Sequence, residues 1–502
     1  MKEKHPQNLT GTAANHTDIA GNQHKGEKGE EQPQIAKSSE KSLLAALQKH
    51  KQAERASFHT PGHKGRLDTI FQTESSTDSA LDLTELPGLD SLSQPQGILA
   101  DTAAAASSLY GAGATFLSVN GASAAITAAI LAASPRGDSI LVPRNAHRSV
   151  LDAICLTGLT PIWYQPTWNR HWALWDESTV EAIETALNEA LEQEKKAGSQ
   201  SRKIALAVVV SPTYGGALSD IKALAQALHK RGIPLLVDEA HGAHHIEGSI
   251  TPGALAAGAD LVAQSLHKTL TGLTQTGLLH VGKDSLIEAS AAAEAMQRLT
   301  STSPSYLLMA SIDQTIRYLS TTAGIEHLFR LSGLKAELEA RLTARGFQIY
   351  RTAFGTTETH LVVGYGNDSP SLIYDFLVER GVFPEAILGR GVLFMLGLGT
   401  NEADLLLLVE LLCQYASLRE KEPGSTGEFD KESQTPDFLI AMPPHQAIMS
   451  AKTTALDKQA LNRVSAQFLA PCPPGIPLLI PGQVITEEVL ASSKDKQFIV
   501  VA

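Results

Sequence analysis

The sequence predicts an α/β protein whose central sheet is mostly parallel. Apolar runs that fit buried strands recur at residues 139–143, 204–210, 234–238 and 260–264. A helical pattern over residues 219–231, with Ile221, Leu224 and Leu228 on one face, separates two of these runs, and Gly232 ends it. This strand–helix–strand rhythm implies right-handed crossovers and a ligand site at the carboxyl ends of the strands.

A second α/β unit follows the first along the chain. Between residues 325 and 420, helical patterns flank strand-like runs at residues 348–350, 360–364 and 392–396. Residues 420–437, EKEPGSTGEFDKESQTPD, are polar and rich in turn-forming residues, as expected of a linker. The chain then ends in the strand-like run QFIVVA.

The N-terminal part differs in composition from the rest of the chain. Residues 1–38 are rich in Gln, Asn, Gly, Lys and Glu, so we expect a disordered tail, because this composition buries too little apolar surface to fold. A short amphipathic helix is expected around Leu43, Leu44 and Leu47. The predicted segments are the tail (1–38), an N-terminal segment (39–96), a large domain (97–324), a small α/β domain (325–420), a linker (421–437) and a C-terminal α+β module (438–502).

Composition and charge exclude several classes of function. The chain has 502 residues, of which 43% are hydrophobic and 19% charged, and these values are typical of globular proteins. With 41 basic and 53 acidic residues, the net charge is −12, so we expect no nucleic-acid partner, since duplex-binding surfaces are usually basic. No apolar run approaches the ~20 residues of a membrane span, and no signal peptide is evident. We therefore expect a cytoplasmic protein with no membrane partner.

Neither disulfides nor a metal site are expected. The three cysteines are odd in number and far apart, which argues against a disulfide framework. Three histidines fall in the predicted tail, at His5, His16 and His24. Their spacing fits no ligand pattern, and solvated tail side chains are the favoured interpretation.

The string QSLHKTL, residues 264–270, carries the most specific chemical signal. Lys268 follows an apolar run and is expected where a parallel strand leaves the sheet. A partly desolvated lysine can lose its proton and attack a carbonyl to form a Schiff base. The alternative is a solvated loop lysine, which is the commoner case when the string is taken alone.

Three further features precede Lys268 in the chain. VNGASAAITAAILAA runs from a strand into a helix that opens around Gly121, and small residues there let backbone N–H groups approach an anion. PRNAHRSV places His147 on a loop after a strand, where its ring is able to stack on a flat ligand. In PLLVDEAHGAHH, Asp238 ends a strand and is placed to keep a pyridine nitrogen protonated. Taken singly, each feature also fits an ordinary turn, a polar loop or a capping residue.

Together, the four features follow the order found in pyridoxal-phosphate enzymes of fold type I, the aspartate-aminotransferase type. The sequence further resembles the ornithine/lysine/arginine decarboxylase family, in its short form without an N-terminal wing. The resemblance rests on the strings HTPGHKG (59–65), DLTELPGLDSL (82–92), NGAS, PRNAHRS, SPTYGG, VDEAHGAHH and SLHK. The string RVSAQFLAPCPPGIPLLIPGQ (463–483) resembles the closing domain of that family.

The resemblance implies a role for individual residues of the large domain. Lys268 would carry the cofactor as an aldimine, Asp238 would pair with its pyridine nitrogen, and His147 would stack on its ring. The remaining cofactor residues implied are Ser123, Ser265, His267 and the amide of Ala122 at the phosphate, Ala240 and His241 beside the ring, and Thr213 with Tyr214 nearby. Candidate substrate residues, in a segment expected to contribute to the active site, are His59, His63, Glu85 and Asp90.

Some of these assignments have open alternatives. Glu85 and Asp90 also fit turn and helix-cap carboxylates. Many relatives carry a hydroxyl residue in place of Ala122, so one side-chain hydrogen bond to the phosphate is absent here. Gln483 stands where relatives often have glutamate, and this leaves the substrate open.

The implied activity is decarboxylation of arginine, lysine or ornithine to a di- or polyamine, through a quinonoid supported by Asp238. A homodimer or higher homo-oligomer is implied, without the decamer that the wing builds in larger relatives. An aminotransferase is the first alternative, but residues 391–400 lack the arginine that such enzymes use to clamp a carboxylate. The second is an inactive regulatory relative, against which the intact Lys268 and Asp238 argue.

Overall fold

The structure is a computed structural model that describes residues 42–54, 57, 60–61, 64, 66–67, 79–198, 202–421, 438–470, 475–492 and 497–502. The predicted tail, nearly all of the predicted linker, and the candidate residues His59 and His63 lie outside the described residues. Within the described residues, no helix is both long and apolar enough to cross a membrane.

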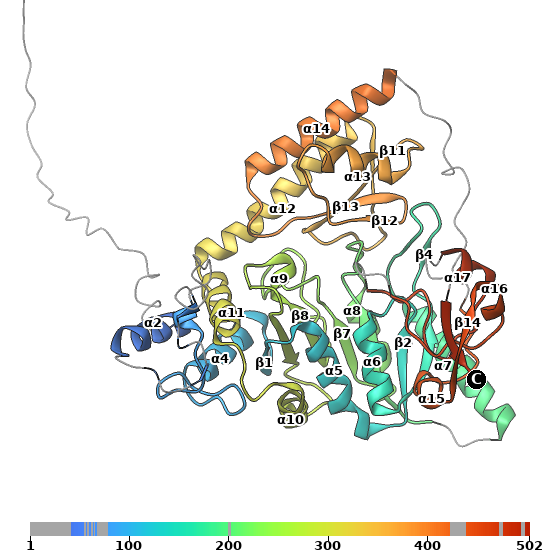
Figure 1. Ribbon diagram of the computed structural model, residues 1–502, viewed down its shortest axis with the longest axis horizontal. Helices are drawn as coiled ribbons and strands as arrows, with labels where there is room; N and C mark the ends of the chain where they lie inside the picture. Colours follow the sequence, from blue (N-terminus) through green and yellow to red (C-terminus); the bar gives the residue numbers. More distant parts are fainter. Residues whose placement is uncertain are drawn as a thin grey trace, which may run out of the picture.

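A seven-stranded sheet forms the centre of the large domain (Figure 1). Its strands in spatial order are β1 (Ala114–Ser118), β9 (Gly277–Val281), β8 (Leu261–Ser265), β7 (Leu235–Asp238), β6 (Ile204–Val210), β2 (Ser139–Pro143) and β3 (Thr160–Tyr164). Only β9 runs antiparallel to its neighbours, and the other pairs are parallel. The prediction of an α/β fold with a mostly parallel sheet is confirmed.

Helices cover both faces of this sheet, which explains the unbroken apolar runs in its strands. In β6, Leu206 and Val208 belong to one core, while Ala207 and Val209 belong to the core on the opposite face. The first core is closed by α5 (Gly121–Ala133), α6 (Arg148–Thr157) and α10 (Ala289–Leu299). The second is closed by α7 (Val180–Ala197) and α8 (Ile221–His229). Short helices η2 (Ser134–Arg136) and α9 (Leu266–Thr269) follow α5 and β8.

A separate group of helices packs at the β1 end of the sheet. It consists of α2 (Leu43–Ala53), the short helix η1 (Ser79–Leu81), α4 (Ile98–Tyr110) and α11 (Tyr306–Leu319). Asp313 on α11 is fully buried and ties them together. Its carboxylate accepts the N–H of Leu43 at 3.0 Å and the hydroxyl of Thr102 at 2.7 Å, and it pairs with Arg317 Nε at 2.7 Å.

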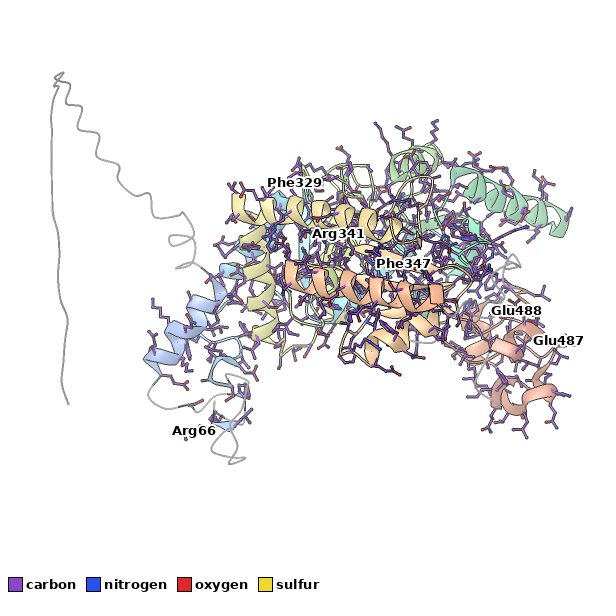
Figure 2. The ribbon with its side chains drawn as sticks, turned by 90° about the horizontal axis from the view of Figure 1, so that it is seen from above. Arg66, Phe329, Arg341, Phe347, Glu487 and Glu488 are labelled. Carbon is purple, nitrogen blue, oxygen red and sulfur yellow. The ribbon has the colours of Figure 1, made fainter. Side chains whose placement is uncertain are left out.

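The small domain places an antiparallel sheet beneath two long helices. Its elements are α12 (Thr322–Thr343), β10 (Phe347–Ile349), β11 (His360–Tyr365), α13 (Pro370–Val378), β12 (Ala386–Leu388), β13 (Gly391–Met395) and α14 (Glu402–Lys421), with strand order β10-β11-β13-β12. Figure 2 shows α12, which carries Phe329 and Arg341, side by side with α14. Leucines at 338 and 342 of α12 pack against Leu408 and Leu412 of α14 in one core.

The C-terminal module lies at the β3 end of the large sheet (Figure 1). It contains α15 (Pro444–Met449), β14 (Lys452–Leu456), α16 (Asp457–Ala460), α17 (Glu487–Ser492) and β15 (Gln497–Val501). Arg144, in the large domain, attaches it: the guanidinium donates to Pro477 O at 3.0 Å and lies 4.3 Å from the Phe438 ring centroid. Gln483 is fully buried in this module, where its Oε1 accepts the N–H of Ile480 at 3.2 Å.

The tryptophan-rich run WYQPTWNRHWALW, residues 163–175, joins the large and small domains. It forms a hairpin of β4 (Trp168–Asn169) and β5 (Leu174–Trp175), whose two tryptophan rings meet edge to face at 4.8 Å. Trp172, at the tip, packs against Tyr350 and accepts the N–H of Arg390 at its carbonyl oxygen. The run therefore serves domain contact and, through Trp168 and Trp175, lines a recess described below.

Replacing Asp313 tests the anchoring of α2 and α4. Asp313→Ala leaves the Leu43 N–H and the Thr102 hydroxyl buried without this acceptor, so we expect the free energy of unfolding to fall by about 3 kcal/mol or more. Urea denaturation of the holoenzyme measures the loss. Asp375→Ala, on the exposed face of α13, is the matched control and should change the same quantity by less than about 0.5 kcal/mol. Equal losses in the two variants would contradict this account of Asp313.

Candidate active site

A large cavity opens where β7 and β8 end. It encloses about 1190 Å³, its open mouth included. Because β7 and β8 are adjacent and parallel, the residues that end them meet at one edge of the sheet, as the sequence predicts. Ten of the eleven residues that the resemblance places at or near the cofactor line it: Ala122, Ser123, His147, Tyr214, Asp238, Ala240, His241, Ser265, His267 and Lys268.

Lys268 stands at the start of a chain of hydrogen-bonded imidazoles. Its Nζ lies 2.9 Å from His241 Nε2, and His241 Nδ1 lies 3.0 Å from His360 Nε2 on β11. Burial, together with the charge of Lys268, holds the pKa of both histidines well below 6.5. Both rings are therefore neutral at pH 7, and His241 Nε2 is able to accept a hydrogen bond from Lys268. Thr359 Oγ1, 3.0 Å from His360 Nδ1, ends the chain.

His147, at the N-cap of α6, and Asp238, at the end of β7, face the same cavity. Asp238 is only 4% exposed, and its Oδ1 accepts the N–H of Ala240 at 3.2 Å. His147 caps α6, where its Nδ1 accepts the N–H of Ser149 at 3.1 Å. Burial lowers the pKa of His147, although the charge of Asp238 opposes this effect. An orientation fixed at Nδ1 and a neutral ring both suit stacking on a flat ligand.

The N-terminus of α5 forms a cradle of backbone N–H groups. Gly121 begins the helix with a positive φ of 71°, a conformation that glycine adopts without strain. Gly277 on β9 packs closely against the cradle. A Cβ at this position would stand 2.9 Å from Ala122 N and 2.8 Å from Gln264 O, so the close approach requires glycine. Beside it, His267 Nδ1 bonds Thr276 O at 3.1 Å, which leaves Nε2 as the nitrogen that the ring offers to the cavity. This cluster is suited to an anion.

The structure places the other predicted residues away from this cavity. Thr213 does not line it, and its Oγ1 accepts the N–H of Ala217 at 3.0 Å, although the adjacent Tyr214 does line it. Neither Glu85 nor Asp90 lines it within this chain. The Asp90 carboxylate accepts four backbone N–H groups at 2.8 to 3.0 Å, which outweigh burial and lower the pKa of Asp90. These hydrogen bonds favour the alternative interpretation of Asp90, as a turn and helix-cap carboxylate.

Several cavity residues were missed by sequence reasoning. Glu385 lies just before β12, and its Oε1 accepts the Tyr214 hydroxyl at 2.7 Å. The sequence carried no signal for it, because this contact joins two domains. Asn145, whose buried Oδ1 has no hydrogen-bond partner among the described residues, stands two positions before His147 in a quoted motif. Its position in that motif was a usable signal.

A second recess continues from the cavity. It shares Asn145, Tyr214 and Ile476 with the cavity and encloses about 1040 Å³, open solvent included. Its walls include the aromatic rings of Trp168 and Trp175, and the carboxylate of Glu488 lies on its C-terminal side. The two spaces together offer room for both a cofactor and an extended substrate.

Solved structures of similar shape define the class of protein. Lysine decarboxylase A from Pseudomonas aeruginosa superposes with a TM-score of 0.75 at 21% identity, covering 91% of this chain and 77% of that one. The constitutive lysine decarboxylase of Escherichia coli gives 0.71 at 22% identity, covering 89% and 76%. At these identities the likeness establishes the fold, which is fold type I of the pyridoxal-phosphate enzymes.

Sequence comparison then establishes the family. The family model for the major domain of Orn/Lys/Arg decarboxylases matches residues 41–348. An arginine decarboxylase of Halalkalibacterium halodurans is 31% identical over 475 residues, 89% of this chain and 92% of that protein. An arginine decarboxylase of Bacillus subtilis is 31% identical over 465 residues, 89% and 91%. The chain belongs to the Orn/Lys/Arg decarboxylase family and is a pyridoxal-phosphate-dependent amino acid decarboxylase.

The cavity fits the cofactor of this family. Pyridoxal phosphate needs an anion site for its phosphate, a carboxylate for its ring nitrogen and an amine for its aldehyde. The cavity offers the N–H cradle at Ala122, the carboxylate of Asp238 and the amine of Lys268. Because Gly277 has no Cβ, β9 approaches the first turn of α5 without a clash at Ala122 N.

Filling the space behind the cradle tests this fit. In Gly277→Ala the new Cβ would push β9 and the first turn of α5 apart, so we expect the affinity for pyridoxal phosphate to fall about tenfold or more. Titration of the cofactor-free protein, followed by visible absorbance, measures the dissociation constant. Gly333→Ala, whose new Cβ would have no atom within 4 Å, is the control and should leave it unchanged. Unaltered affinity in Gly277→Ala would show that the phosphate binds elsewhere.

Proposed function

We propose that this chain decarboxylates a basic amino acid and that Lys268, Asp238 and His147 are its catalytic residues. The observation that carries the proposal is the convergence of these side chains on one cavity at the ends of β7 and β8. Relatives that are about 31% identical are named arginine decarboxylases, so arginine is the first substrate to test. Lysine is the second, because the constitutive lysine decarboxylase of Escherichia coli is 24% identical over 540 residues.

In this proposal, the cofactor is held by both backbone and side chains. The phosphate is bound by the N–H of Ala122 and by Ser123, Ser265 and His267. Ala240 and His241 flank the ring, with Thr213 behind Tyr214. When bound, pyridoxal phosphate supplies an electron sink for the charge that carbon dioxide leaves behind. Asp238 would keep the proton on the ring nitrogen, and His147 would stack on the ring.

Proton handling falls to Lys268 and its histidine partners. After carbon dioxide has left, the substrate Cα takes up a proton in its place, and the Lys268 ammonium is the group proposed to deliver it. His241 orients Nζ through their 2.9 Å contact, and His360 fixes His241 in turn. Because both rings stay neutral, they do not compete with Lys268 for positive charge. Positioning of this kind contributes to catalysis by keeping the donor in reach.

The charges around the cavity favour decarboxylation over amino transfer. The described lining residues of the cavity include no arginine, and Arg144, which lines the adjoining recess, donates to Pro477 O at 3.0 Å. Arg390, next to β13, instead donates to His171 O at 3.3 Å. A transaminase needs a bidentate clamp for a carboxylate that stays, whereas a decarboxylase must release that group. Glu385 is proposed to receive the cationic end of the substrate, since it is exposed at the cavity and already oriented by Tyr214.

Three finer features stay proposals that the family resemblance alone supports. They are a di- or polyamine product, a homodimer to which residues 39–96 contribute, and a cytoplasmic location. In a dimer, Glu85 and Asp90 would belong to the partner-facing part of that segment.

Substrate preference and the role of Lys268 are tested together. The holoenzyme should release carbon dioxide from arginine, and with lower kcat/KM from lysine or ornithine. Lys268→Ala should lose the visible absorption band of the bound cofactor and reduce kcat by about a thousandfold or more, since both the covalent link and the proton donor are removed. Release from none of the three amino acids would reduce the proposal to a shared fold.

The role of Glu385 has its own measurement. Glu385→Gln keeps the shape of the side chain but removes its charge, so KM for the basic amino acid should rise about tenfold while kcat changes little. Steady-state kinetics with the preferred substrate separate the two parameters. Glu379→Gln, an exposed position before the same strand pair, is the control and should match the parent enzyme. If KM is unchanged in Glu385→Gln, another group recognises the cationic end.

A further inference from the structure

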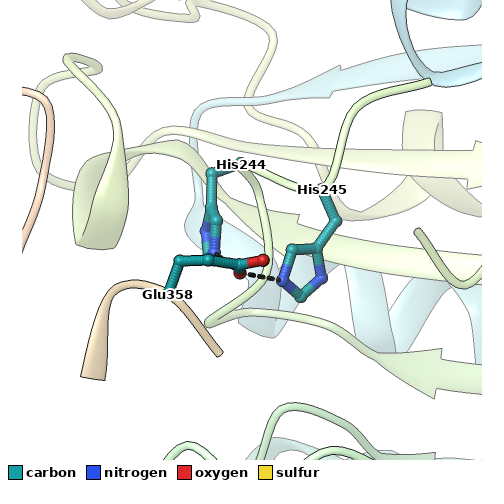
Figure 3. A group of neighbouring side chains, drawn as sticks. All are labelled: His244, His245 and Glu358. Carbon is teal, nitrogen blue, oxygen red and sulfur yellow. Dashed lines mark ion pairs between the residues drawn. The ribbon is translucent and has the colours of Figure 1, made fainter. Parts of the chain in front are cut away.

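Behind the active-site cavity, three side chains converge from two domains. His244 and His245 lie in the loop after β7, three and four positions beyond His241. Glu358 lies in the small domain, two positions before His360 on β11. Figure 3 shows the three side chains pointing toward one another across the domain boundary. None of them lines the cofactor cavity.

The distances among these groups match those of ligands around one small cation. Glu358 Oε2 lies 3.4 Å from His244 Nε2 and 3.5 Å from His245 Nε2. The three ligand atoms all lie within 4.8 Å of one another. A tetrahedral zinc site with ligand distances near 2.1 Å has edges of about 3.4 Å between its ligands. Small rotations of the imidazoles would therefore bring all three atoms into coordination.

Thr357 Oγ1 occupies the fourth corner of this arrangement. It lies 2.8 Å from His244 Nε2, 3.1 Å from His245 Nε2 and 3.4 Å from Glu358 Oε2. Its hydroxyl can donate to one imidazole and accept from the other, so it holds the two Nε2 atoms at a common point. A fourth ligand, either this hydroxyl or a water, would complete a tetrahedron there.

Outer contacts fix the orientation of each candidate ligand. His245 Nδ1 lies 3.4 Å from Glu239 Oε1, and His244 Nδ1 lies 3.4 Å from Thr269 Oγ1. The second oxygen of Glu358 accepts the Thr251 hydroxyl at 2.5 Å. Metal-binding histidines almost always bond a carboxylate or another polar group through their second nitrogen, which turns the first toward the metal. All three candidate ligands here carry such a partner.

The cluster is enclosed but can be reached from the surface. His244 and His245 are 5% and 3% exposed. A recess of about 430 Å³, open solvent included, is lined by both histidines and Glu358, and the side chains of Ile250 and Phe329 at its rim are about half exposed. This recess connects the cluster with the surface, and burial of the two histidines would shield a bound ion from water.

An ion pair is the competing account of these contacts. An ion pair needs only one protonated imidazole beside Glu358, whereas the Nε2 atoms of two imidazoles converge on the same carboxylate oxygen, at 3.4 and 3.5 Å. A neutral imidazole aimed at the same carboxylate oxygen is, by contrast, what a metal ion binds.

We propose that His244, His245 and Glu358 bind one divalent transition-metal ion, with zinc the best match. Two imidazole nitrogens and one carboxylate suit zinc, whereas magnesium and calcium prefer all-oxygen sites. The ion joins the loop after β7 to the strand that carries His360, so it clamps the small domain onto the large one. Its binding does not depend on the substrate proposed above.

Metal titration of the tag-free holoenzyme, stripped with a chelator and returned to chelator-free buffer, tests the proposal. Calorimetry with Zn²⁺ should give one equivalent per chain. Co²⁺ should give a tetrahedral d–d band at longer wavelength than the cofactor band. Glu358→Gln should weaken binding about a hundredfold and abolish the d–d band. Glu239→Gln, which changes the outer contact to His245 together with those to Ala254 and Gln264, should weaken binding about tenfold.

Controls keep the outcomes distinguishable. Glu247→Gln changes an exposed carboxylate on the rim of the same recess and should bind metal like the parent protein. Cofactor content and circular dichroism confirm that each variant is folded. Absence of stoichiometric binding by the parent protein would overturn the proposal and leave the ion pair. An undiminished Co²⁺ band in Glu358→Gln would also overturn it, because the metal would then be held elsewhere, for example at the cofactor.

Discussion

The contact between Lys268 and His241, continued to His360, links the packing of the two domains to the geometry of the cavity. It requires the end of β8, the loop after β7 and the first residue of β11 to meet within hydrogen-bonding distance. The large sheet supplies the first two, because its parallel strands end at one edge. The third comes from the small domain, so the packing of the two domains sets the geometry of the active site.

The sequence predicted the parts of the site that depend on local structure. Asp238, Lys268 and the helix opening at Gly121 each lie where an apolar strand gives way to a turn or helix, and that transition is visible in the residue pattern. The alternation of strands and helices also predicted the mostly parallel sheet. The antiparallel strand β9 was not predicted, because a run such as GLLHV carries no information about its direction.

The contacts between domains could not be predicted in the same way. His360, Glu385 and Glu358 lie more than a hundred residues beyond the partners they meet, and nothing in their local sequence distinguishes them from ordinary polar residues. Asp90 is the opposite case. The motif that contains it was recognised in the sequence, but its carboxylate accepts hydrogen bonds from four backbone N–H groups. Only packing decides which of two chemically reasonable roles a carboxylate takes.

The central claim is that Lys268 is the residue to which the cofactor is covalently linked. Borohydride reduction of the holoenzyme makes this link permanent, and digestion followed by mass spectrometry locates it on the chain. The account predicts that the modified residue is Lys268, in near-stoichiometric yield, within the peptide containing QSLHKTL. Modification of another lysine, or a reduced protein that carries no cofactor, would contradict it.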